Sequence, residues 1–378
     1  MEETAYDIRR ADTLAAWQQA LAEVPQTPAL AGARRADLFG RFAAWYGRLR
    51  SQPRAERRRW QRQLGLSLAG IALLLAVNGA PVGAVGPAAM ITVTDSTGTV
   101  ANNGACSLPE AIINANNNAA THADCTAGSG ADTISLSTNV ALTAVNNTTI
   151  SGANGLPVIT SSITIEGNGQ AISRQVGSPN FRILTVNSGG NLILNSATIS
   201  GGSRPGGGGG GGIYNQGTLT VQNSTISGNS ADSARGGGIN NYGTMTMQNS
   251  TLSGNSAGAR GGGIQNWGTL TVSSSTLSGN SATLVGGGIA NAGTLTMQNS
   301  TLFGNSAETG GGISNQSTLT VSNSTLSGGS ASSGGGGIHN LSNVVTVQNS
   351  IVAMQAAGVA DCSIGSGTLT SLGYNIES

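Results

Sequence analysis

The chain has 378 residues and a formal net charge of +1 at pH 7, with 9% charged and 3% aromatic residues. Glycine supplies 59 residues, a bias typical of repetitive surface proteins rather than of cytosolic enzymes. All 17 basic residues are arginines, and 12 of them precede Gln63. With seven acids there, residues 1–63 carry net +5, and the remainder has five arginines against nine acids, net −4.

Residues 1–63 are predicted to be helical. Trp17, Leu21 and Trp45 lie among alanines and arginines, and Pro25 and Pro28 divide the run into two helices. The segment is either an Arg-rich n-region or a small cytoplasmic segment. Positive charge before an apolar segment is the ordinary orientation signal for insertion, so we expect no binding to nucleic acid.

Residues 64–84 are predicted to be a signal peptide core or a membrane anchor. Residues 64–77 are fourteen uncharged residues, too few to span a bilayer comfortably, and they would contact the membrane during export or as an anchor. Val82, Gly83 and Ala84 supply small residues for cleavage after Ala84. The n-region is long for a signal, which leaves three explanations: a start codon placed too early, an extended signal, or a module on an uncleaved anchor. We expect a secreted or cell-surface protein or, alternatively, a membrane-anchored one.

Residues 91–130 are predicted to form an N-terminal cap. Ile91 begins a short strand, and Ser107 can cap a helix whose first turn contains Pro109 and Glu110. A stack of repeats needs such a cover because its first coil has no neighbour to bury its apolar face.

Residues 131–378 are predicted to form a parallel β-helix, with regular repeats over 206–352. Apolar and polar residues alternate with period two within each copy, and glycine-rich corners separate the runs, which indicates about three short strands per coil. The predicted fold is therefore all-β, a right-handed parallel β-helix of about 25 residues per coil. The anchor residues recur at steps of 26, 25, 25, 24 and 25: Ile213, Ile239, Ile264, Ile289, Ile313 and Ile338.

Two rows of asparagine recur in register and are predicted to form coil-to-coil ladders of hydrogen-bonded carboxamides. Four residues of the second row also begin Asn-Ser-Thr glycosylation sequons, which a repeating turn residue explains more simply. The first row is Asn215, Asn241, Asn266, Asn291, Asn315 and Asn340, and the second is Asn223, Asn249, Asn299 and Asn323.

A family resemblance appears in the predicted cap. Thr92-Val93-Thr94-Asp95, followed by Cys106-Ser107-Leu108-Pro109-Glu110-Ala111-Ile112, resembles the bacterial domain named for its Cys-Ser-Leu-Arg-Glu-Ala motif, with Pro109 in place of arginine. The repeats are similar to those of polymorphic outer-membrane proteins. The resemblance covers residues 91–378 and implies a right-handed β-helix and export; most members have no assigned activity.

Cys106 and Cys125 lie in the predicted cap, 19 residues apart, and are expected to form a disulfide. The closed loop is worth about 3 kcal/mol in the chain-entropy model. Cys362 has no predicted partner; members of the family usually continue to another cysteine, which leaves open that the chain is cut short. The three cysteines and two histidines show no zinc spacing.

The repeats offer no predicted catalytic, cofactor or metal residues. Asp232 and Glu308 are three coils apart, about 14 Å at β spacing, whereas glycosidase carboxylates work about 5 to 9.5 Å apart. The glycine run 206–212 recurs at every coil without a following lysine, so turns explain it better than a phosphate loop.

The predicted function is that of an exported non-catalytic surface protein, adhesin-like or structural, which binds extracellular glycans or surface proteins through a Ser, Thr and Asn face. Tyr242 and Trp267 occupy equivalent positions of adjacent coils and are possible ligand contacts that could stack on sugar rings. His339 is predicted to be a variable outward residue. The alternative is a carbohydrate-active β-helix enzyme, similar to pectate lyases or glycosidases.

Overall fold

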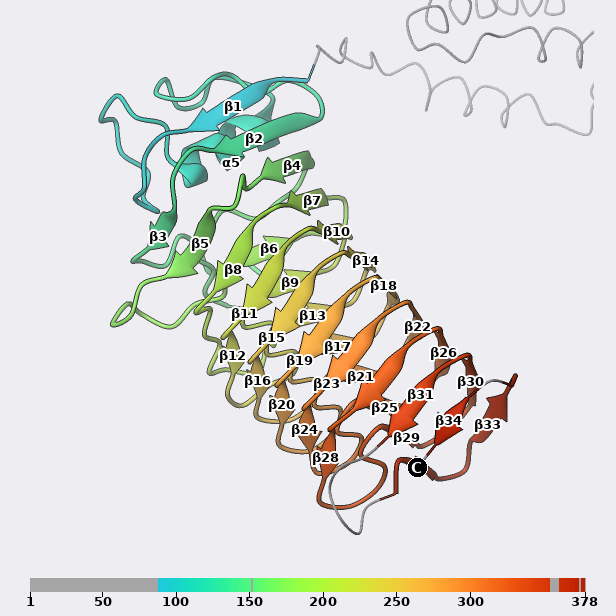
Figure 1. Ribbon diagram of the computed structural model, residues 1–378. Helices are drawn as coiled ribbons and strands as arrows, with labels where there is room; N and C mark the ends of the chain where they lie inside the picture. The colour runs from blue at the N-terminus through green and yellow to red at the C-terminus, as the bar shows by residue number, and fades with distance from the viewer. Residues whose placement is uncertain (1–87, 151, 354–359, 374, 378) are drawn as a thin grey trace, which may run out of the picture. The chain divides into compact units, whose positions relative to one another are not determined.

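The computed structural model describes residues 88–150, 152–353, 360–373 and 375–377, which belong to one compact unit, Val85–Ser378. The unit is an all-β parallel solenoid whose coils stack in sequence order from the cap onward (Figure 1). The predicted segments 1–63 and 64–84 lie outside the described residues.

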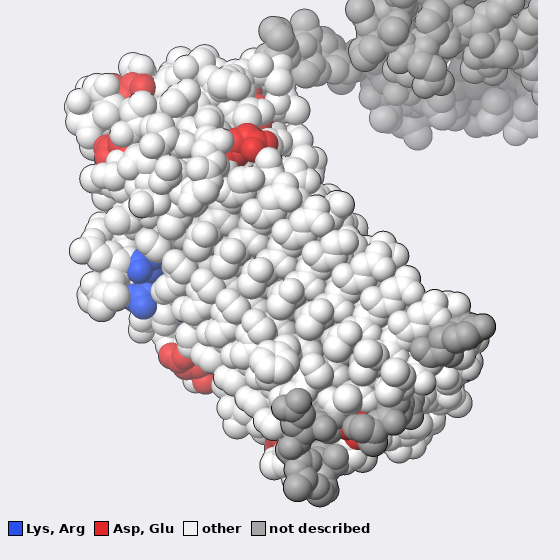
Figure 2. Space-filling view, in the orientation of Figure 1, with Lys and Arg blue, Asp and Glu red and all other residues white. Residues whose placement is uncertain are grey.

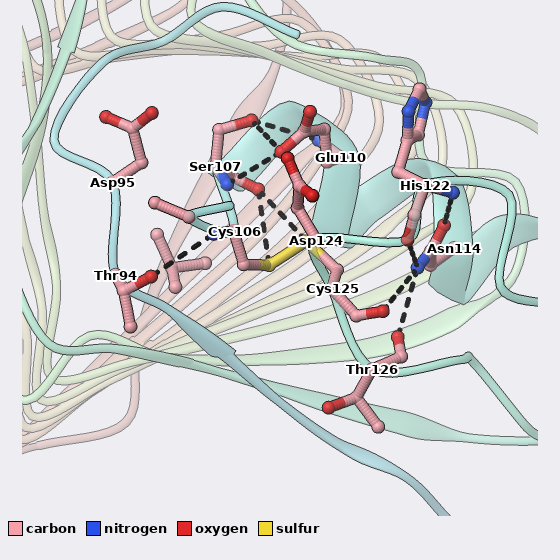
Figure 3. The surroundings of a disulfide bond; sticks show 12 residues. Thr94, Asp95, Cys106, Ser107, Glu110, Asn114, His122, Asp124, Cys125 and Thr126 are labelled. Atoms are coloured by element: carbon pink, nitrogen blue, oxygen red, sulfur yellow. Dashed lines mark hydrogen bonds between the residues drawn. A yellow bond between two sulfur atoms is a disulfide. The ribbon is translucent and has the colours of Figure 1, made fainter. Parts of the chain in front are cut away.

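The cap is built around the helix α5 (Leu108–Asn117). The Ser107 hydroxyl accepts from the backbone N–H of Glu110, which confirms Ser107 as the helix cap. The Glu110 carboxylate also accepts from the backbone N–H of Ser107 at 3.0 Å, so the two residues form a capping box. Figure 3 shows the Cys106–Cys125 disulfide beside this helix, with Cα atoms 4.7 Å apart, which confirms that prediction.

Sheet 1 has eleven parallel strands and runs the whole length of the solenoid. Its strands alternate buried and outward residues, and equivalent residues pair directly: Leu219 with Met245, Met245 with Leu270, and Leu270 with Leu295. The strands are β1 (Met90–Val93), β2 (Asp132–Leu136), β4 (Ser162–Glu166), β7 (Asn191–Asn195), β10 (Thr218–Gln222), β14 (Thr244–Gln248), β18 (Thr269–Ser273), β22 (Thr294–Gln298), β26 (Thr318–Ser322), β30 (Val344–Gln348) and β33 (Thr368–Ser371).

Sheet 2 has ten parallel strands. In each coil, its strand follows the strand of sheet 1 after one corner of the chain. Figure 2 shows that the surface over the middle of this sheet carries no charged residue. Its strands are β3 (Val140–Leu142), β5 (Ala171–Arg174), β8 (Thr198–Ser200), β11 (Thr225–Ser227), β15 (Thr251–Ser253), β19 (Thr276–Ser278), β23 (Thr301–Phe303), β27 (Thr325–Ser327), β31 (Ile351–Ala353) and β34 (Ile376–Glu377).

Sheet 3 has eight parallel strands and contains the repeated Ile-x-Asn segments. The isoleucines are buried in the core and pair in series along the sheet, as Ile239 does with Ile213 and Ile264. The strands are β6 (Leu184–Val186), β9 (Ile213–Asn215), β13 (Ile239–Asn241), β17 (Ile264–Asn266), β21 (Ile289–Asn291), β25 (Ile313–Asn315), β29 (Ile338–Asn340) and β32 (Cys362–Ile364).

Sheet 4 is a fourth, five-stranded sheet of two-residue strands, so the middle coils have four strands and not the three predicted. The Ser-Gly-Asn-Ser segment predicted as a corner bends at glycines with positive φ and then pairs again at Ser-Ala. The strands are β12 (Ser230–Ala231), β16 (Ser256–Ala257), β20 (Ser281–Ala282), β24 (Ser306–Ala307) and β28 (Ser330–Ala331).

The first asparagine row forms a continuous ladder inside the corner between sheets 3 and 1. Each Nδ2 donates to the Oδ1 of the next coil, at 2.7 Å from Asn215 to Asn241 and at 2.8 to 2.9 Å in the four later steps as far as Asn340. The side chains are 98 to 100% buried. The ladder therefore satisfies polar groups that the apolar columns cannot.

The second asparagine row differs from its prediction. Asn223, Asn249, Asn299 and Asn323 are exposed and have φ between 48° and 51°, so their shared property is a left-handed turn conformation that asparagine tolerates. The carboxamide hydrogen bonds at this corner join Asn223 to Asn195 and Asn349 to Asn323. We therefore correct the predicted continuous ladder for this row: backbone geometry explains the repetition.

Two further polar ladders were not predicted. In the Ser-Gly-Asn-Ser segments, Asn229 donates from Nδ2 to Asn255 at 3.0 Å, and the chain continues through Asn280 to Asn305. At the corner between sheets 1 and 2, the backbone N–H of Ser224 donates to the hydroxyl of Ser250, and the pattern repeats in the following coils. The available sequence signal was their recurrence: the serine recurs in every copy, and the asparagine recurs until Gly329 replaces it.

Candidate ligand-binding groove

The outer face of sheet 3 is a groove whose floor is made of the middle residue of each strand. In each three-residue strand the flanking isoleucine and asparagine point inward, so the middle side chain points away from the core. These side chains are nevertheless buried or half-buried. The floor residues are Tyr214, Asn240, Gln265, Ala290, Ser314 and His339.

One side of the groove, the loop rim, precedes each sheet 3 strand. Arg235, Arg260, Val285 and Thr309 stack there through isolated parallel β-bridges. Coil length varies at this corner, but its last residue is fixed in register. The chain re-enters sheet 3 through a glycine. Gly261, for example, has φ +65°, a conformation that favours glycine.

The opposite side, the turn rim, follows each ladder asparagine and consists of Gln216, Tyr242, Trp267, Ala292 and Gln316. The backbone N–H of each residue from Tyr242 to Gln316 donates to the carbonyl of the ladder asparagine one coil earlier, at 2.7 to 2.8 Å. Rim side chains therefore recur at the coil spacing. Between the two rims, a shallow hollow is lined by Arg260, Gln265, Val285, Ala290, Asn291, Ala292, Ser314 and Gln316.

An aromatic cluster occupies the groove on the N-terminal side of this hollow. The Tyr242 and Trp267 rings stack with centroids 5.9 Å apart and planes 14° apart, and Tyr214 packs against Tyr242 at 5.6 Å. The Arg235 guanidinium lies 5.4 Å from the centre of the Trp267 ring. The structure thus brings together Tyr242 and Trp267, the two predicted contact residues, and adds Tyr214 and Arg235.

Arg182 anchors the N-terminal end of the aromatic cluster. Its side chain is fully buried and donates to the carbonyls of Gly209 at 2.5 Å and Gly210 at 3.0 Å, and to Asn154 Oδ1 at 3.1 Å. Its guanidinium lies 4.7 Å from the centre of the Tyr214 ring. Burial, with a further contribution from Arg204, lowers the pKa of Arg182 to about 9.

Buried polar atoms without hydrogen-bond partners concentrate along the groove. Of the six such side-chain atoms in the described residues, five belong to groove residues: Asn240 Oδ1, Gln265 Oε1, Trp267 Nε1, Ser314 Oγ and His339 Nδ1. An unpaired buried polar atom costs about 1 to 3 kcal/mol. Groups of this kind, gathered in one surface groove, are what a hydrogen-bonding ligand would satisfy.

Burial shapes the titration of two groove residues. It raises the pKa of Tyr242, to which Tyr214 also contributes, while Arg235 and a hydrogen bond with Asn240 act in the opposite direction. Burial lowers the pKa of His339, which favours the neutral imidazole. His339 points away from the core as predicted, but it is half-buried in the groove floor rather than exposed.

The carboxylates of the cap and first coils serve as hydrogen-bond acceptors. Asp124 accepts from the backbone N–H groups of Asn103 and Gly104 at 2.8 and 3.0 Å, and Asp132 accepts from that of Ser129 at 2.8 Å. Glu166 accepts from Asn195 Nδ2 at 2.6 Å. Within the described ranges, no three His, Cys, Asp or Glu side chains are grouped to hold a metal ion.

Comparison with known proteins gave no match to a family model, to a curated protein or to a solved structure. The parallel solenoid that the family resemblance implied is present, while the domain assignment itself stays a prediction. Among the described residues, no helix has the length and apolar character needed to cross a membrane. Residues 64–77 fall outside that range.

Proposed function

We propose that this protein is an exported, non-catalytic surface protein, adhesin-like or structural, that binds extended polar ligands, glycans or proteins, along its β-helix. The observation that carries the proposal is the groove of sheet 3, where stacked aromatic rings adjoin a row of buried polar atoms without partners. Aromatic faces and convergent hydrogen-bonding groups are the usual lining of a ligand site.

Export is supported by the sequence of residues 54–84, in which a basic cluster precedes an apolar core and small residues. The Cys106–Cys125 disulfide suits an oxidising compartment. The proposed location is therefore the cell surface or the medium, or the membrane through an uncleaved anchor. Fractionation of the host should find the solenoid outside the cytoplasm with an N-terminus near Val85; a cytoplasmic protein that begins at Met1 would contradict export.

A non-catalytic role is supported by the placement of acidic residues in the stack. Asp232 follows β12, where its carboxylate accepts a hydrogen bond from Ser230, whereas Glu308 follows β24, three coils later. Carboxylates so far apart do not form an acid–base pair. The alternative, a polysaccharide lyase or glycosidase, would be supported by release of reducing ends or unsaturated products that is lost in D232N or E308Q.

The direct test is an array of glycans and extracellular-matrix proteins probed with the full chain. Trp267→Ala should weaken binding to the best ligand by roughly tenfold or more, because loss of a stacked ring costs about 1 to 3 kcal/mol. Phe303→Ala is the matched control, because Phe303 is 52% exposed on β23 of sheet 2. Equal losses in both variants, or no binding to any array member, would refute the proposal.

A further inference from the structure

The hollow in the groove exists because small residues replace large ones at two equivalent rows. On the floor, Ala290 follows Gln265, and on the turn rim Ala292 follows Trp267 in the next coil. On the N-terminal side of the hollow, the floor row holds Tyr214 and the turn rim holds Tyr242 and Trp267. At the hollow itself, both rows continue with alanine. The residues that line the hollow come from three successive coils, so the hollow is shallow and about 10 Å long at the spacing of β-strands.

The floor of the hollow offers hydrogen bonds that the protein itself does not use. Gln265 is 1% exposed and Ser314 is 2% exposed, and both line the hollow. Gln265 Nε2 donates to the carbonyl of Ala290 at 3.2 Å, which leaves Oε1 without a donor, and Ser314 Oγ has no partner. A carboxamide oxygen and a hydroxyl two coils apart, on either side of Ala290, match a ligand that carries several hydroxyl groups.

The charge at the hollow is positive. The half-buried Arg260 lines it, and no described residue gives the Arg260 side chain a hydrogen bond or an ion pair. The acidic residues on neighbouring loops, Asp232 and Glu308, are exposed and do not line the hollow. An unpaired guanidinium at a partly buried site favours a carboxylate or a sulfate, which it can bind through two parallel hydrogen bonds.

The strand pairing of sheet 3 disfavours an extended peptide as the ligand. β17, β21 and β25 are each paired on both sides, so their backbone groups cannot take up an added strand. The groove therefore offers side chains only: a hydroxyl, a carboxamide, a guanidinium and, at its N-terminal end, the Trp267 ring. This set fits a sugar better than a polypeptide.

We propose that this hollow binds an acidic sugar residue of an oligosaccharide, with Arg260 on its carboxylate or sulfate, and Gln265 and Ser314 on its hydroxyl groups. This inference rests on the proposed function and names the ligand class of that same groove. Trp267 packs against the adjoining sugar of the chain. The uronate and the sulfated sugar share one chemistry, an anion on a polyhydroxylated ring, and the experiment separates them.

The experiment is isothermal titration of the full chain with four hexasaccharides: oligogalacturonate, its methyl ester, a heparin fragment and its desulfated form. At least one acidic probe should bind roughly tenfold or more tightly than its neutral counterpart, since hydrogen bonds to charged groups contribute about 1.5 to 3 kcal/mol. Arg260→Gln should reduce this ratio to about one, and Arg260→Lys should restore part of it. A preference confined to oligogalacturonate identifies a carboxylate ligand, and one confined to the heparin fragment identifies a sulfate.

Arg174→Gln is the control for net charge, because Arg174 lies on β5 of sheet 2 and should leave the ratio unchanged. An unchanged ratio in Arg260→Gln, or binding of neither acidic probe while array ligands still bind, overturns the inference and leaves the proposed function standing. A glutamate hexapeptide that binds as tightly as the acidic sugars would show that charge alone is recognised and would also overturn it. Failure of every array ligand to bind is the separate failure of the proposed function.

Discussion

Single residues in this protein are determined by backbone conformation as much as by packing. Gly261 adopts φ +65° where the loop rim enters sheet 3, and an added Cβ would meet the carbonyl oxygen of Ile264. Asn249 adopts φ 48° at the corner between sheets 1 and 2, and its carboxamide is exposed. Both positions need a left-handed conformation, but only the position of Gly261 also lacks the space for a side chain.

Replacement of Gly261 by alanine should lower the free energy of unfolding by about 2 kcal/mol or more, since a left-handed conformation costs an alanine about 1 to 2 kcal/mol and the steric clash adds to it. Gly189→Ala is the control, because Gly189 is exposed, with open space around its Cα and no positive φ. Denaturant titration of both variants measures the difference, and equal unfolding midpoints would contradict the argument.

His339 should make stability depend on pH. Its pKa in the folded protein lies below the ordinary value of 6.5, because burial disfavours the imidazolium. The unfolded state then binds the proton more readily, so the stabilisation is complete above pH 6.5 and is lost as the pH falls through the folded pKa. The melting temperature should drop less between pH 7 and pH 5 in His339→Gln than in the wild type; identical slopes would assign the dependence to other groups.

At the scale of elements, each short strand is held by pairing with the equivalent strands of the adjacent coils. A strand of three residues such as β17 cannot be stable alone, and its register is fixed by Ile264 in the apolar column and Asn266 in the ladder. The carboxamide of Asn266 hydrogen-bonds to polar groups at the corner, while the side chain of Ile264 fills the core. An apolar residue at the ladder position would leave several neighbours unpaired.

Asn266→Leu should therefore cost about 2 to 4 kcal/mol of unfolding free energy. Its Nδ2 donates to Asn291 Oδ1 at 2.8 Å and to the carbonyls of Thr294 and Gly268 at 3.1 and 3.2 Å, all of which lose a donor in the variant. Asn249→Leu, the same change at an exposed turn, should cost about 1 kcal/mol from its left-handed backbone. Thermal melting of the two variants compares them, and a larger loss for Asn249→Leu would remove the ladder argument.

At the scale of the whole molecule, stability is the sum of similar coils, each in contact with its two neighbours. Sheets 1, 2 and 3 extend through every regular coil, and α5 with β1 closes the N-terminal end. Removal of one complete coil preserves all registers, whereas removal of part of a coil sets strands of different sheets against each other. The molecule should tolerate only the first change.

Deletion of residues 264–288, one coil from Ile264 to the residue before its partner Ile289, should leave a soluble solenoid with strand-type circular dichroism and a moderately lower melting temperature. Deletion of residues 264–276 is the control, because it ends inside the coil and should produce aggregated protein on size-exclusion chromatography. A folded control variant, or an unfolded one-coil deletion, would show that the coils are not interchangeable.

The sequence by itself determined the solenoid, the helix of the cap and the pairing of Cys106 with Cys125. Period-two alternation and the recurrence of isoleucine are local signals, and the stacking of coils does not alter the strands that they predict. It also placed Tyr242 and Trp267 at equivalent positions, because a fixed repeat converts sequence spacing into spatial neighbourhood.

Only the tertiary structure decided which face of the solenoid forms a groove. The floor row holds a tyrosine, an asparagine, a glutamine, an alanine, a serine and a histidine in successive coils, so it shows no repeated residue type that a sequence pattern could detect. The burial of this row is a property of the folded chain, in which the loop rim and the turn rim lie on either side of it. For the same reason the fourth strand of the middle coils, only two residues long, was decided by pairing with the adjacent coils rather than by its own sequence.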